Sequence, residues 1–280
     1  MMRSLFIAAS GLKAQQTNMD IISNNLSNVN TTGFRKSRPD FQSLIYQQLR
    51  QPAYGTEGFF NPTSKEVGHG VRIVGTVYEF SQGAPQETGN VTDICIMGEG
   101  FYAVQMPDGS VGYTRDSAMK IDQDGYIVNA NGYRLLSERG NASANGTTSV
   151  TIGGRTLRHI RIEPEEIPSL AISEEGWIST DEIELGDRVG ISLVRFANPQ
   201  ALTSYGNNIF IHNEACGEIF VGQPGQGNFG GIHSGFLEAS NVKLADEMVN
   251  MIICQRAYEI NTKAVQTSDE LMGYTNQLKR

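Results

Sequence analysis

The sequence has little cysteine and little histidine. It contains three cysteines and four histidines among 280 residues. Cys95, Cys216 and Cys254 are odd in number and far apart, so they fit neither a disulfide framework nor a metal knuckle. We expect them to act as small apolar core residues. The histidines stand in separate segments, without the spacing that metal ligands show, and we expect no metal site.

Long apolar runs and clusters of positive charge are also missing. Near the N-terminus the apolar run lasts only from Leu5 to Ala9, shorter than the ~7–15 residues of a signal-peptide core and the ~18 of a membrane span. The formal net charge is −8, and no Lys/Arg run is longer than Arg35-Lys36. Because phosphate binding needs a clustered cationic face, this argues against a nucleic-acid partner. We expect no membrane insertion and no cleaved signal peptide.

What the sequence does contain begins with a helix over about the first thirty residues, built on a seven-residue repeat. One line of the repeat holds Leu5, Leu12, Met19 and Leu26, and the other holds Ala8, Gln15, Ile22 and Val29. Only Arg3, Lys13 and Asp20 are charged, and residues 21–34, IISNNLSNVNTTGF, carry no charge at all. A helix that faces water usually carries charge on its outer face. We therefore expect other copies of the chain to cover this N-terminal helix.

A second, more charged helix is predicted at the C-terminal end, with Ser240 or Asn241 as its N-cap. Its repeat holds Ile253, Ile260, Thr267 and Tyr274 on one line and Ala257, Ala264, Leu271 and Leu278 on the other. Since both helices show the same type of repeat, we expect them to pack together as a coiled coil. The residues expected at the assembly interface are Leu5, Leu12, Met19, Ile22, Leu26, Val29, Ile253, Ala257, Ile260, Ala264 and Leu271.

The middle of the chain is rich in strand signals. Turn sequences between β-rich runs predict hairpins at Pro107-Asp108-Gly109, Asp124-Gly125 and Asn131-Gly132. Further strands are expected at residues 157–162, 176–178 and 189–196, and a mobile loop at residues 139–155. The fold class is therefore α+β, with long N- and C-terminal coiled-coil helices joined to a central, mainly antiparallel β domain. The expected domains are a helical one (1–34 with 236–280), connecting segments (35–92 and 206–235) and the β domain (93–205).

No motif makes a convincing catalytic or binding site. Residues 225–230, GQGNFG, match GxGxxG, but we expect extended chain after them, where a dinucleotide site needs a helix. Residues 122–125, DQDG, begin like a calcium loop, yet Asn131 stands where that loop needs Glu. Residues 212–214, HNE, lack the P-C-x-x-C partner of zinc deaminases. We expect no enzyme, no cofactor and no catalytic or metal-binding residue.

Four blocks of the sequence share a pattern with one protein family. They are residues 4–47 (SLFIAASGLKAQQTNMDIISNNLSNVNTTGFRKSRPDFQSLIYQ), 96–136 (IMGEGFYAVQMPDGSVGYTRDSAMKIDQDGYIVNANGYRLL), 194–210 (VRFANPQALTSYGNNIF) and 240–272 (SNVKLADEMVNMIICQRAYEINTKAVQTSDELM). Together they resemble the bacterial flagellar basal-body rod and hook proteins, and most closely the members that form the distal rod. Residues 49–71, LRQPAYGTEGFFNPTSKEVGHGV, lie where those members carry a longer connection than hook proteins.

The resemblance implies a structural subunit and not an enzyme. In this family both terminal helices pack inside a helical tube around an export channel, with the β domain outside. It implies a straight, hollow drive shaft that spans the periplasm within the basal body and transmits torque to the hook. The implied partners are further copies in a helical homopolymer, other rod proteins, the hook protein, the L and P ring proteins, and the flagellar type III export apparatus, which needs no cleaved signal.

Other interpretations stay open at this point. A proximal-rod or hook-type axial protein shares the signatures of both ends. Outside the family, the residues alone leave two further possibilities open: a coiled-coil adhesin, and an enzyme that uses the glycine-rich segment.

Overall fold

The computed structural model describes residues 2–50, 53–54, 60–61, 64–141, 149–163, 169–180 and 189–277. The chain divides into two compact units. The first consists of Met1–Ser27, Ser37–Val77 and Lys243–Arg280, and the second of Asn28–Lys36 and Tyr78–Val242. The backbone therefore passes from one unit to the other four times.

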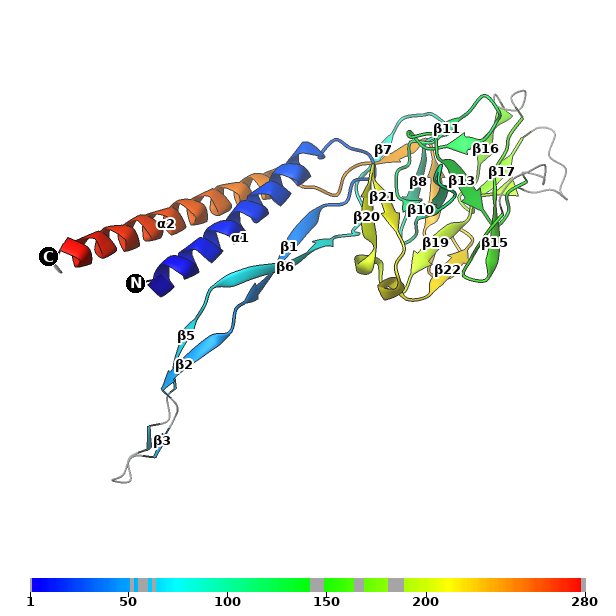
Figure 1. The fold of residues 1–280 in the computed structure, drawn as a ribbon. Coiled ribbons are helices and arrows are strands. Elements are labelled where there is room, and N and C mark those ends of the chain that lie inside the picture. The colour runs from blue at the N-terminus through cyan, green and yellow to red at the C-terminus, as the bar shows by residue number, and fades with distance from the viewer. Residues whose placement is uncertain are drawn as a thin grey trace. The chain divides into compact units, whose positions relative to one another are not determined.

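Two long helices dominate the first unit, α1 (Met2–Ser27) and α2 (Leu244–Gln277), and they lie side by side as an antiparallel pair (Figure 1). The predicted helix at each end is thus confirmed, although α1 ends at Ser27, a few residues before the expected end near residue 30. The chain turns there: the Thr31 N–H donates to the Asn28 carbonyl, and Gly33 adopts a φ of 66° that favours glycine. In the described part of the chain, neither helix is both long enough and apolar enough to cross a membrane.

The start of α2 differs from the prediction. The helix begins at Leu244, and the Glu247 N–H donates to the carbonyl of Lys243. The expected N-cap at Ser240 or Asn241 is therefore wrong. The Asn241 side chain is committed elsewhere, because its Oδ1 accepts from the backbone N–H of Lys36 at 2.7 Å. Asp246 and Glu247 lie in the first turn, where carboxylates interact favourably with the helix dipole.

A chain of two-stranded ribbons follows α1 in the first unit. The pairs are β1 (Ser37–Ser43) with β6 (Val71–Tyr78), β2 (Tyr46–Arg50) with β5 (Lys65–Gly68), and β3 (Ala53–Tyr54) with β4 (Phe60–Asn61). β1 packs against α1, and the Asn25 side chain forms hydrogen bonds with both the N–H and the carbonyl of Ser37. The expected rod-type stretch, residues 49–71, includes β3, β4 and β5. Its residues 51–52, 55–59 and 62–63 lie outside the described part.

The second unit is built on a nine-stranded sheet, counted over the described residues, in which every described pairing is antiparallel. Its main path is β11 (Lys120–Ile121), β12 (Ile127–Val128), β13 (Arg134–Ser137), β9 (Tyr102–Gln105), β10 (Val111–Thr114), β21 (Ile209–Ile211) and β20 (Thr203–Gly206). Off this path, β15 (Arg155–His159) pairs with β13 and with β14 (Val150–Ile152).

Smaller sheets complete the second unit. They are β16 (Ala171–Ile172), β17 (Trp177–Ser179) and β18 (Val189–Gly190); β19 (Leu193–Phe196) with β22 (Ile219–Gly222); β23 (Gly231–Ser234) with β8 (Ile94–Met97); and β24 (Phe236–Glu238) with β7 (Pro85–Glu87). Two short 3-10 helices, η2 (Pro199–Ala201) and η3 (Glu214–Cys216), stand between strands. Residues 206–235, expected as connecting extended or β segments, contribute β21, β22 and β23 to this unit.

The predicted hairpin turns are confirmed. The turn at Pro107-Asp108-Gly109 joins β9 to β10, and Gly109 has a φ of 82° there. Asp124-Gly125 joins β11 to β12, and Asn131-Gly132 joins β12 to β13. The mobile loop expected at residues 139–155 is wrong in part, because Val150–Ile152 forms β14 and pairs with β15. Residues 142–148 of that loop lie outside the described part.

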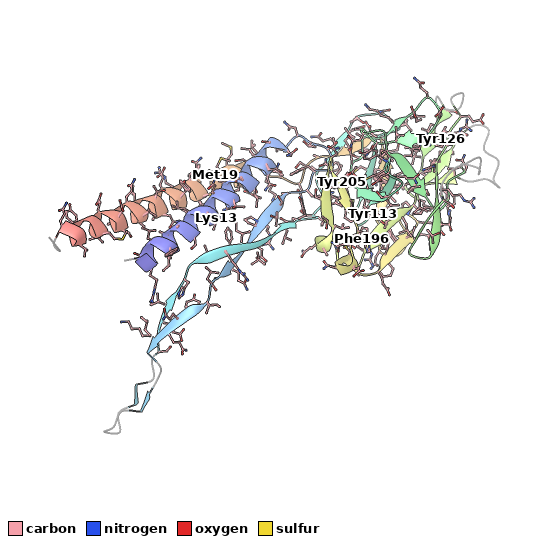
Figure 2. All side chains as sticks on the ribbon, viewed as in Figure 1. Lys13, Met19, Tyr113, Tyr126, Phe196 and Tyr205 are labelled. Atoms are coloured by element: carbon pink, nitrogen blue, oxygen red, sulfur yellow. The ribbon has the colours of Figure 1, made fainter. Side chains whose placement is uncertain are left out.

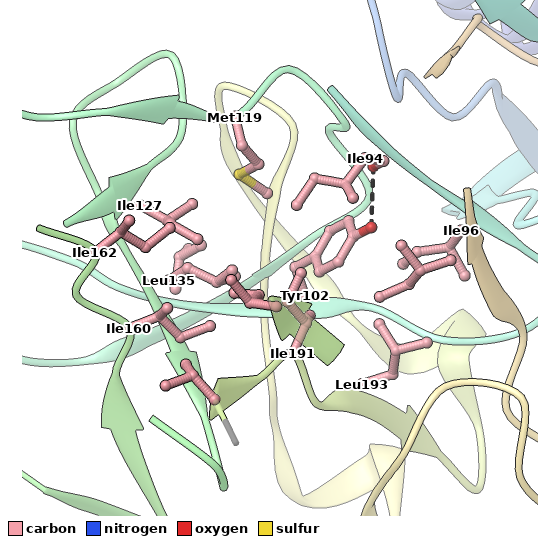
Figure 3. Close-up of a cluster of buried hydrophobic side chains, with 14 of the residues drawn as sticks. Ile94, Ile96, Tyr102, Met119, Ile127, Leu135, Ile160, Ile162, Ile191 and Leu193 are labelled. Carbon is pink, nitrogen blue, oxygen red and sulfur yellow. Dashed lines mark hydrogen bonds between the residues drawn. The ribbon is translucent and has the colours of Figure 1, made fainter. Parts of the chain in front are cut away.

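Two clusters of buried side chains form the core of the second unit. The first surrounds Tyr102, whose hydroxyl donates to the carbonyl of Ile94 at 2.9 Å (Figure 3). In the second, the ring of Tyr113 stands edge-on to Phe196, with ring centroids 4.8 Å apart (Figure 2). Burial raises the pKa of the Tyr113 hydroxyl to about 12. Each large apolar side chain buried in this way stabilises the fold by roughly 1.5–3 kcal/mol.

Candidate assembly surface and junction network

The two helices of the first unit meet along a line of small and polar side chains. Ser4 Oγ lies 3.4 Å from Ser268 Oγ near one end, and Asn25 Nδ2 donates to Glu247 Oε2 at 3.4 Å near the other. Between them, successive contacts step seven residues forward on α1 and seven residues back on α2. We name this set the polar ladder: Ser4, Gly11, Asn18 and Asn25 of α1 with Ser268, Asn261, Cys254 and Glu247 of α2.

The helices approach closely in the middle of the polar ladder. A Cβ built on Gly11 would lie 3.2 Å from Asn261 Nδ2, which leaves little room for any larger residue at position 11. The Cys254 thiol donates to the carbonyl of Gln15 at 3.1 Å and also contacts the side chain of Asn18. Burial raises the pKa of Cys254, against the opposing effect of the hydrogen bond with Asn18. The thiol therefore stays protonated at neutral pH and serves as a polar packing group.

The polar ladder lies one residue away from the repeat predicted on α2. Cys254 is buried against α1, whereas Ile253 is 61% exposed and Ile260 is 67% exposed. The prediction that the apolar repeat of α2 faces α1 is therefore wrong. The physical reason is that the prediction followed the most apolar residues of α2, and Ile253 and Ile260 do not form this contact. Leu278 of the predicted repeat lies outside the described residues.

On α1 the structure keeps one predicted line and moves the other to the flank of the contact. Ala8 and Ile22 of the kept line are buried. Val29, also predicted on that line, follows the end of α1 and belongs to the second unit. The residues of the other line, which are half-buried, are Leu5, Leu12, Met19 and Leu26. The apolar positions of α1 thus lie beside the polar ladder and not in it.

α2 carries an apolar face that points away from α1. We name its members the outer stripe: Met248, Val249, Ile252, Ile253, Ile260 and Leu271, all of them exposed. Over residues 248–255 the sequence MVNMIICQ contains no charged residue. Ala264, also predicted at the interface, is exposed, and Ala257 is half-buried. Large exposed apolar patches often mark interaction sites, so the outer stripe is a candidate for one.

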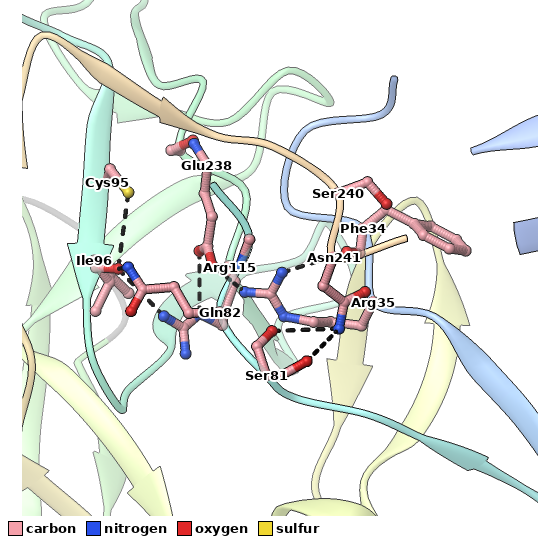
Figure 4. A network of polar contacts seen from close by, with 12 residues as sticks. Phe34, Arg35, Ser81, Gln82, Cys95, Ile96, Arg115, Glu238, Ser240 and Asn241 are labelled. Atoms are coloured by element: carbon pink, nitrogen blue, oxygen red, sulfur yellow. Dashed lines mark hydrogen bonds and ion pairs between the residues drawn. The ribbon is translucent and has the colours of Figure 1, made fainter. Parts of the chain in front are cut away.

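A buried ion network occupies the second unit (Figure 4). Arg35 Nη2 donates to Glu238 Oε1 at 2.6 Å, and Arg115 Nε donates to Glu238 Oε2 at 3.3 Å. The Gly83 N–H adds a third hydrogen bond to Glu238 Oε1, at 3.0 Å. The three charged side chains are at most 3% exposed. We name Arg35, Arg115 and Glu238 the junction triad.

The junction triad places two positive groups on one carboxylate. Arg115 disperses part of its charge through Nη2, which donates to the carbonyls of Gly98 at 2.7 Å and Ile96 at 3.3 Å. Arg35 Nε is buried and has no hydrogen-bond partner in the described part of the chain. Burial lowers the pKa of Arg35 from its ordinary value, and the neighbouring carboxylate of Glu238 opposes that change. The carboxylate is therefore the group on which the whole cluster depends.

The network joins the segments by which the chain enters and leaves the second unit. The Gly33 N–H donates to the Glu238 carbonyl at 2.9 Å, and the Glu238 N–H donates to Ser117 Oγ at 2.7 Å. Next to them, Asn241 accepts from the Lys36 N–H and donates to the Glu79 carbonyl, both at 2.7 Å. These hydrogen bonds connect the segment before β1, the segment after β6 and the segment before α2 to one another and to the core of the second unit.

Sequence reasoning missed the junction triad. Its members are far apart along the chain, and none stands in a recognisable motif. The available signal was Glu238, a single carboxylate in GFLEAS after the apolar strand residues, where a charge is costly unless it is paired. That signal indicates a buried partner without saying which arginine provides it.

The candidate chemical motifs fall into turns and strands. After GQGNFG, residues 231–234 form β23, so the helix that a dinucleotide site requires is not there. DQDG forms the turn between β11 and β12, and His212 Nε2 lies 3.2 Å from the Gly217 carbonyl. Among the described residues, no three His, Cys, Asp or Glu side chains are grouped to hold a metal ion. All three cysteines are buried free thiols, and burial raises the pKa of Cys95 to about 11.

Comparison with known families gives three matches along the chain. Residues 5–35 match the model described as flagella basal body rod protein, residues 95–180 the flagellar hook protein FlgE/F/G D1 domain, and residues 233–278 the flagellar basal body rod FlgEFG protein C-terminal. The first match covers most of α1, and the third covers all of α2.

Similar whole proteins carry related names. Flagellar basal-body rod protein FlgG of Borreliella burgdorferi is 44% identical over 289 residues, with all of both chains covered. The protein of the same name is 38% identical in Buchnera aphidicola subsp. Schizaphis graminum and 34% identical in Caulobacter vibrioides, each with 99% of this chain and 100% of the relative covered. Flagellar hook-basal body complex protein FlhP of Bacillus subtilis is 29% identical over the full length of both chains.

Proposed function

Because the chain belongs to the family of flagellar basal-body rod proteins and is a structural subunit of the rod, we propose that it polymerises through its terminal helices into the distal part of that rod. The proposal concerns the surface used and the position along the axis. The proposed surface includes predicted interface residues on both helices. Those on α2 are exposed in the single chain, whereas those on α1 are half-buried.

The outer stripe of α2 is the observation that carries the proposal. A helix that exposes Ile253 and Ile260 to water gains roughly 1.5–3 kcal/mol for each such side chain that a neighbour covers. The partner is a second copy of the chain, and a heterologous contact that does not close on itself extends into a filament. On α1, four half-buried side chains flank the polar ladder, and a neighbouring copy that packs beside it buries them further: Leu5, Leu12, Met19 and Leu26.

The remaining parts of the proposal rest on the resemblance of the sequence to rod and hook proteins. The polymer is a straight, hollow shaft that encloses an export channel and transmits torque to the hook. Its partners are the other rod proteins, the hook protein and the surrounding L and P ring proteins, and the chain reaches its place through the flagellar type III export apparatus. The role is structural, without catalysis. The coiled-coil character of the helix pair stays a prediction.

The test introduces a charge into the outer stripe. Ile260→Asp, made in the full chain and expressed in a flagellated strain that lacks its own copy, should abolish complete rods in isolated basal bodies and abolish swimming. The isolated variant should keep its thermal stability within about 0.5 kcal/mol, because the position is exposed in the single chain. A buried unpaired charge at every subunit contact costs several kcal/mol and blocks growth.

A matched control separates assembly from general damage. Tyr205 on β20 is 61% exposed, so Tyr205→Asp places the same charge on an equally exposed apolar residue of the other unit (Figure 2). We expect normal rods from this variant. Complete rods from Ile260→Asp, or loss of rods from Tyr205→Asp alone, would contradict the proposed surface.

A further inference from the structure

One line of the contact between α1 and α2 is polar where a stable helix pair would ordinarily be apolar. Antiparallel helices gain most from apolar side chains at the positions that repeat every seven residues. Here the polar ladder holds one line of such positions, the buried Ala8 and Ile22 of α1 stand on another, and the exposed isoleucines of α2 stand one position away from the ladder. On α2, Ile253 precedes Cys254 and Ile260 precedes Asn261. The sequence thus offers α1 a more apolar face of α2 than the one that the structure uses.

A rotation of α2 by about 100° about its own axis would move each residue into the place of its neighbour. That rotation would bury Ile253 and Ile260 against α1 and remove the outer stripe from the surface. It would also take Glu247 away from Asn25 and leave buried polar groups unpaired. Because such groups cost roughly 1–3 kcal/mol each, and more where they are charged, the polar ladder opposes the rotation.

Asn25 occupies the strongest position in the polar ladder. Its Nδ2 donates to the Ser37 carbonyl at 2.8 Å and to Glu247 Oε2 at 3.4 Å, and its Oδ1 accepts from the Ser37 N–H at 3.0 Å. One buried amide therefore fixes α1 against both β1 and the first turn of α2. The contact is specific because a slide of α2 by one residue would break it.

We propose that the polar ladder is a register key, which holds α2 in the one rotation that keeps the outer stripe on the surface for a second copy. That a second copy binds the outer stripe rests on the proposed function. The register key itself concerns only the pairing of α1 with α2 within one chain. Polar groups at single core positions of helix pairs select register at a cost in stability, and that is their role here.

Disulfide trapping in the full chain tests the register. Ser4 and Ser268 have their hydroxyls 3.4 Å apart, so Ser4→Cys with Ser268→Cys should form a disulfide under mild oxidation, while the native thiols stay buried. Ser4→Cys with Thr267→Cys is the displaced pair, since Thr267 is exposed beside the contact. We expect the first pair to cross-link at least fivefold more than the second.

The key is then removed with Asn25→Leu and Glu247→Leu together. The double replacement leaves neither partner of the Asn25–Glu247 contact unpaired, but it also removes the hydrogen bonds of Asn25 with Ser37 and so lowers stability somewhat. Far-UV circular dichroism checks that both helices still form. The preference for Ser268 over Thr267 should fall to about twofold or less. Because this variant changes the first turn of α2, Asn18→Leu with Cys254→Leu breaks a different pair of the ladder and should lower the preference as well.

Two results would overturn the inference. One is equal cross-linking of both pairs in the chain with an intact key, and the other is an unchanged preference in both leucine variants. Neither depends on polymer growth, whereas Ile260→Asp leaves the polar ladder intact and tests assembly alone. A failure of the register key is therefore distinguishable from a failure of the proposed function.

Discussion

Glu238→Gln is the sharpest test of the network inside the second unit. The substitution keeps the shape of the side chain but removes the one negative charge between Arg35 and Arg115. Both guanidinium groups are at most 3% exposed, so neither can recover its solvation without local unfolding. Removal of one partner from a buried ion pair costs about 3–5 kcal/mol. We expect a loss of stability in that range, larger than almost any surface substitution produces.

The measurement is urea unfolding of the full chain, followed by tryptophan fluorescence at pH 7. Trp177 is the single tryptophan of the sequence and lies in β17, so its signal reports on the second unit alone. Glu79→Gln is the matched control. Glu79 pairs with Lys36 at 3.0 Å, but both side chains are partly exposed, and the loss should stay below about 1 kcal/mol.

The reasoning also predicts a rescue. Arg35→Met, Arg115→Met and Glu238→Leu made together remove every buried charge of the junction triad, and apolar replacement of a buried ion cluster is often neutral or stabilising. The triple variant should therefore recover most of the stability that Glu238→Gln loses. A loss of less than about 1 kcal/mol in Glu238→Gln itself would refute the view that the carboxylate holds the segments of the second unit together.

Two other substitutions in the second unit have clear expected outcomes. Burial raises the pKa of Asp116, so near that pKa the folded chain binds more protons than the unfolded one. The free energy of unfolding therefore falls as the pH rises from about 4 through the raised pKa of Asp116. Asp116→Asn keeps the acceptor for the Thr32 hydroxyl, and urea titrations should show it more stable than the original chain at pH 7 and equal to it below about pH 4. Gly33→Ala should cost at least about 2 kcal/mol in the same assay, because Gly33 has a φ of 66° and its new Cβ would lie 2.8 Å from the backbone of Arg115. Gly89→Ala, at a φ of 71° with nothing within 4 Å, is its control and should cost no more than about 1–2 kcal/mol.

Elements that depend on local chemistry were predictable from the sequence. The two terminal helices follow from long periodic patterns, and the hairpins follow from turn residues such as Pro107-Asp108-Gly109, which restrict the backbone over a few positions. The end of α1 was missed by about three residues, because the residues after Ser27 continue a polar pattern that a helix could also contain. β14 was missed because a short strand beside glycine-rich residues has the composition of a loop.

The junction triad could not be predicted from one sequence, since its energy comes from pairing across distance. Arg35 and Arg115 are separated by 80 positions, and Glu238 follows more than 100 positions later. Each is an ordinary charged residue on its own. Only the topology, which places β24 beside the segment after Gly33, makes the carboxylate common to both arginines.

The face of α2 that contacts α1 differs from the one that the apolar repeat predicts, and this difference bears on how the helix is used. The apolar repeat that predicts a seam at Ile253 and Ile260 is real, but the chain does not use it to join its own two helices. In the proposed polymer, α2 contacts a partner within the chain and further copies outside it, so a single sequence repeat must specify two faces of the helix. Apolar residues on the face for the copies give that contact the larger free energy, whereas polar residues on the inner face give direction with little affinity. In the proposed polymer the subunit is then stable enough to present its outer stripe, and the strongest contacts form only when the next copy arrives.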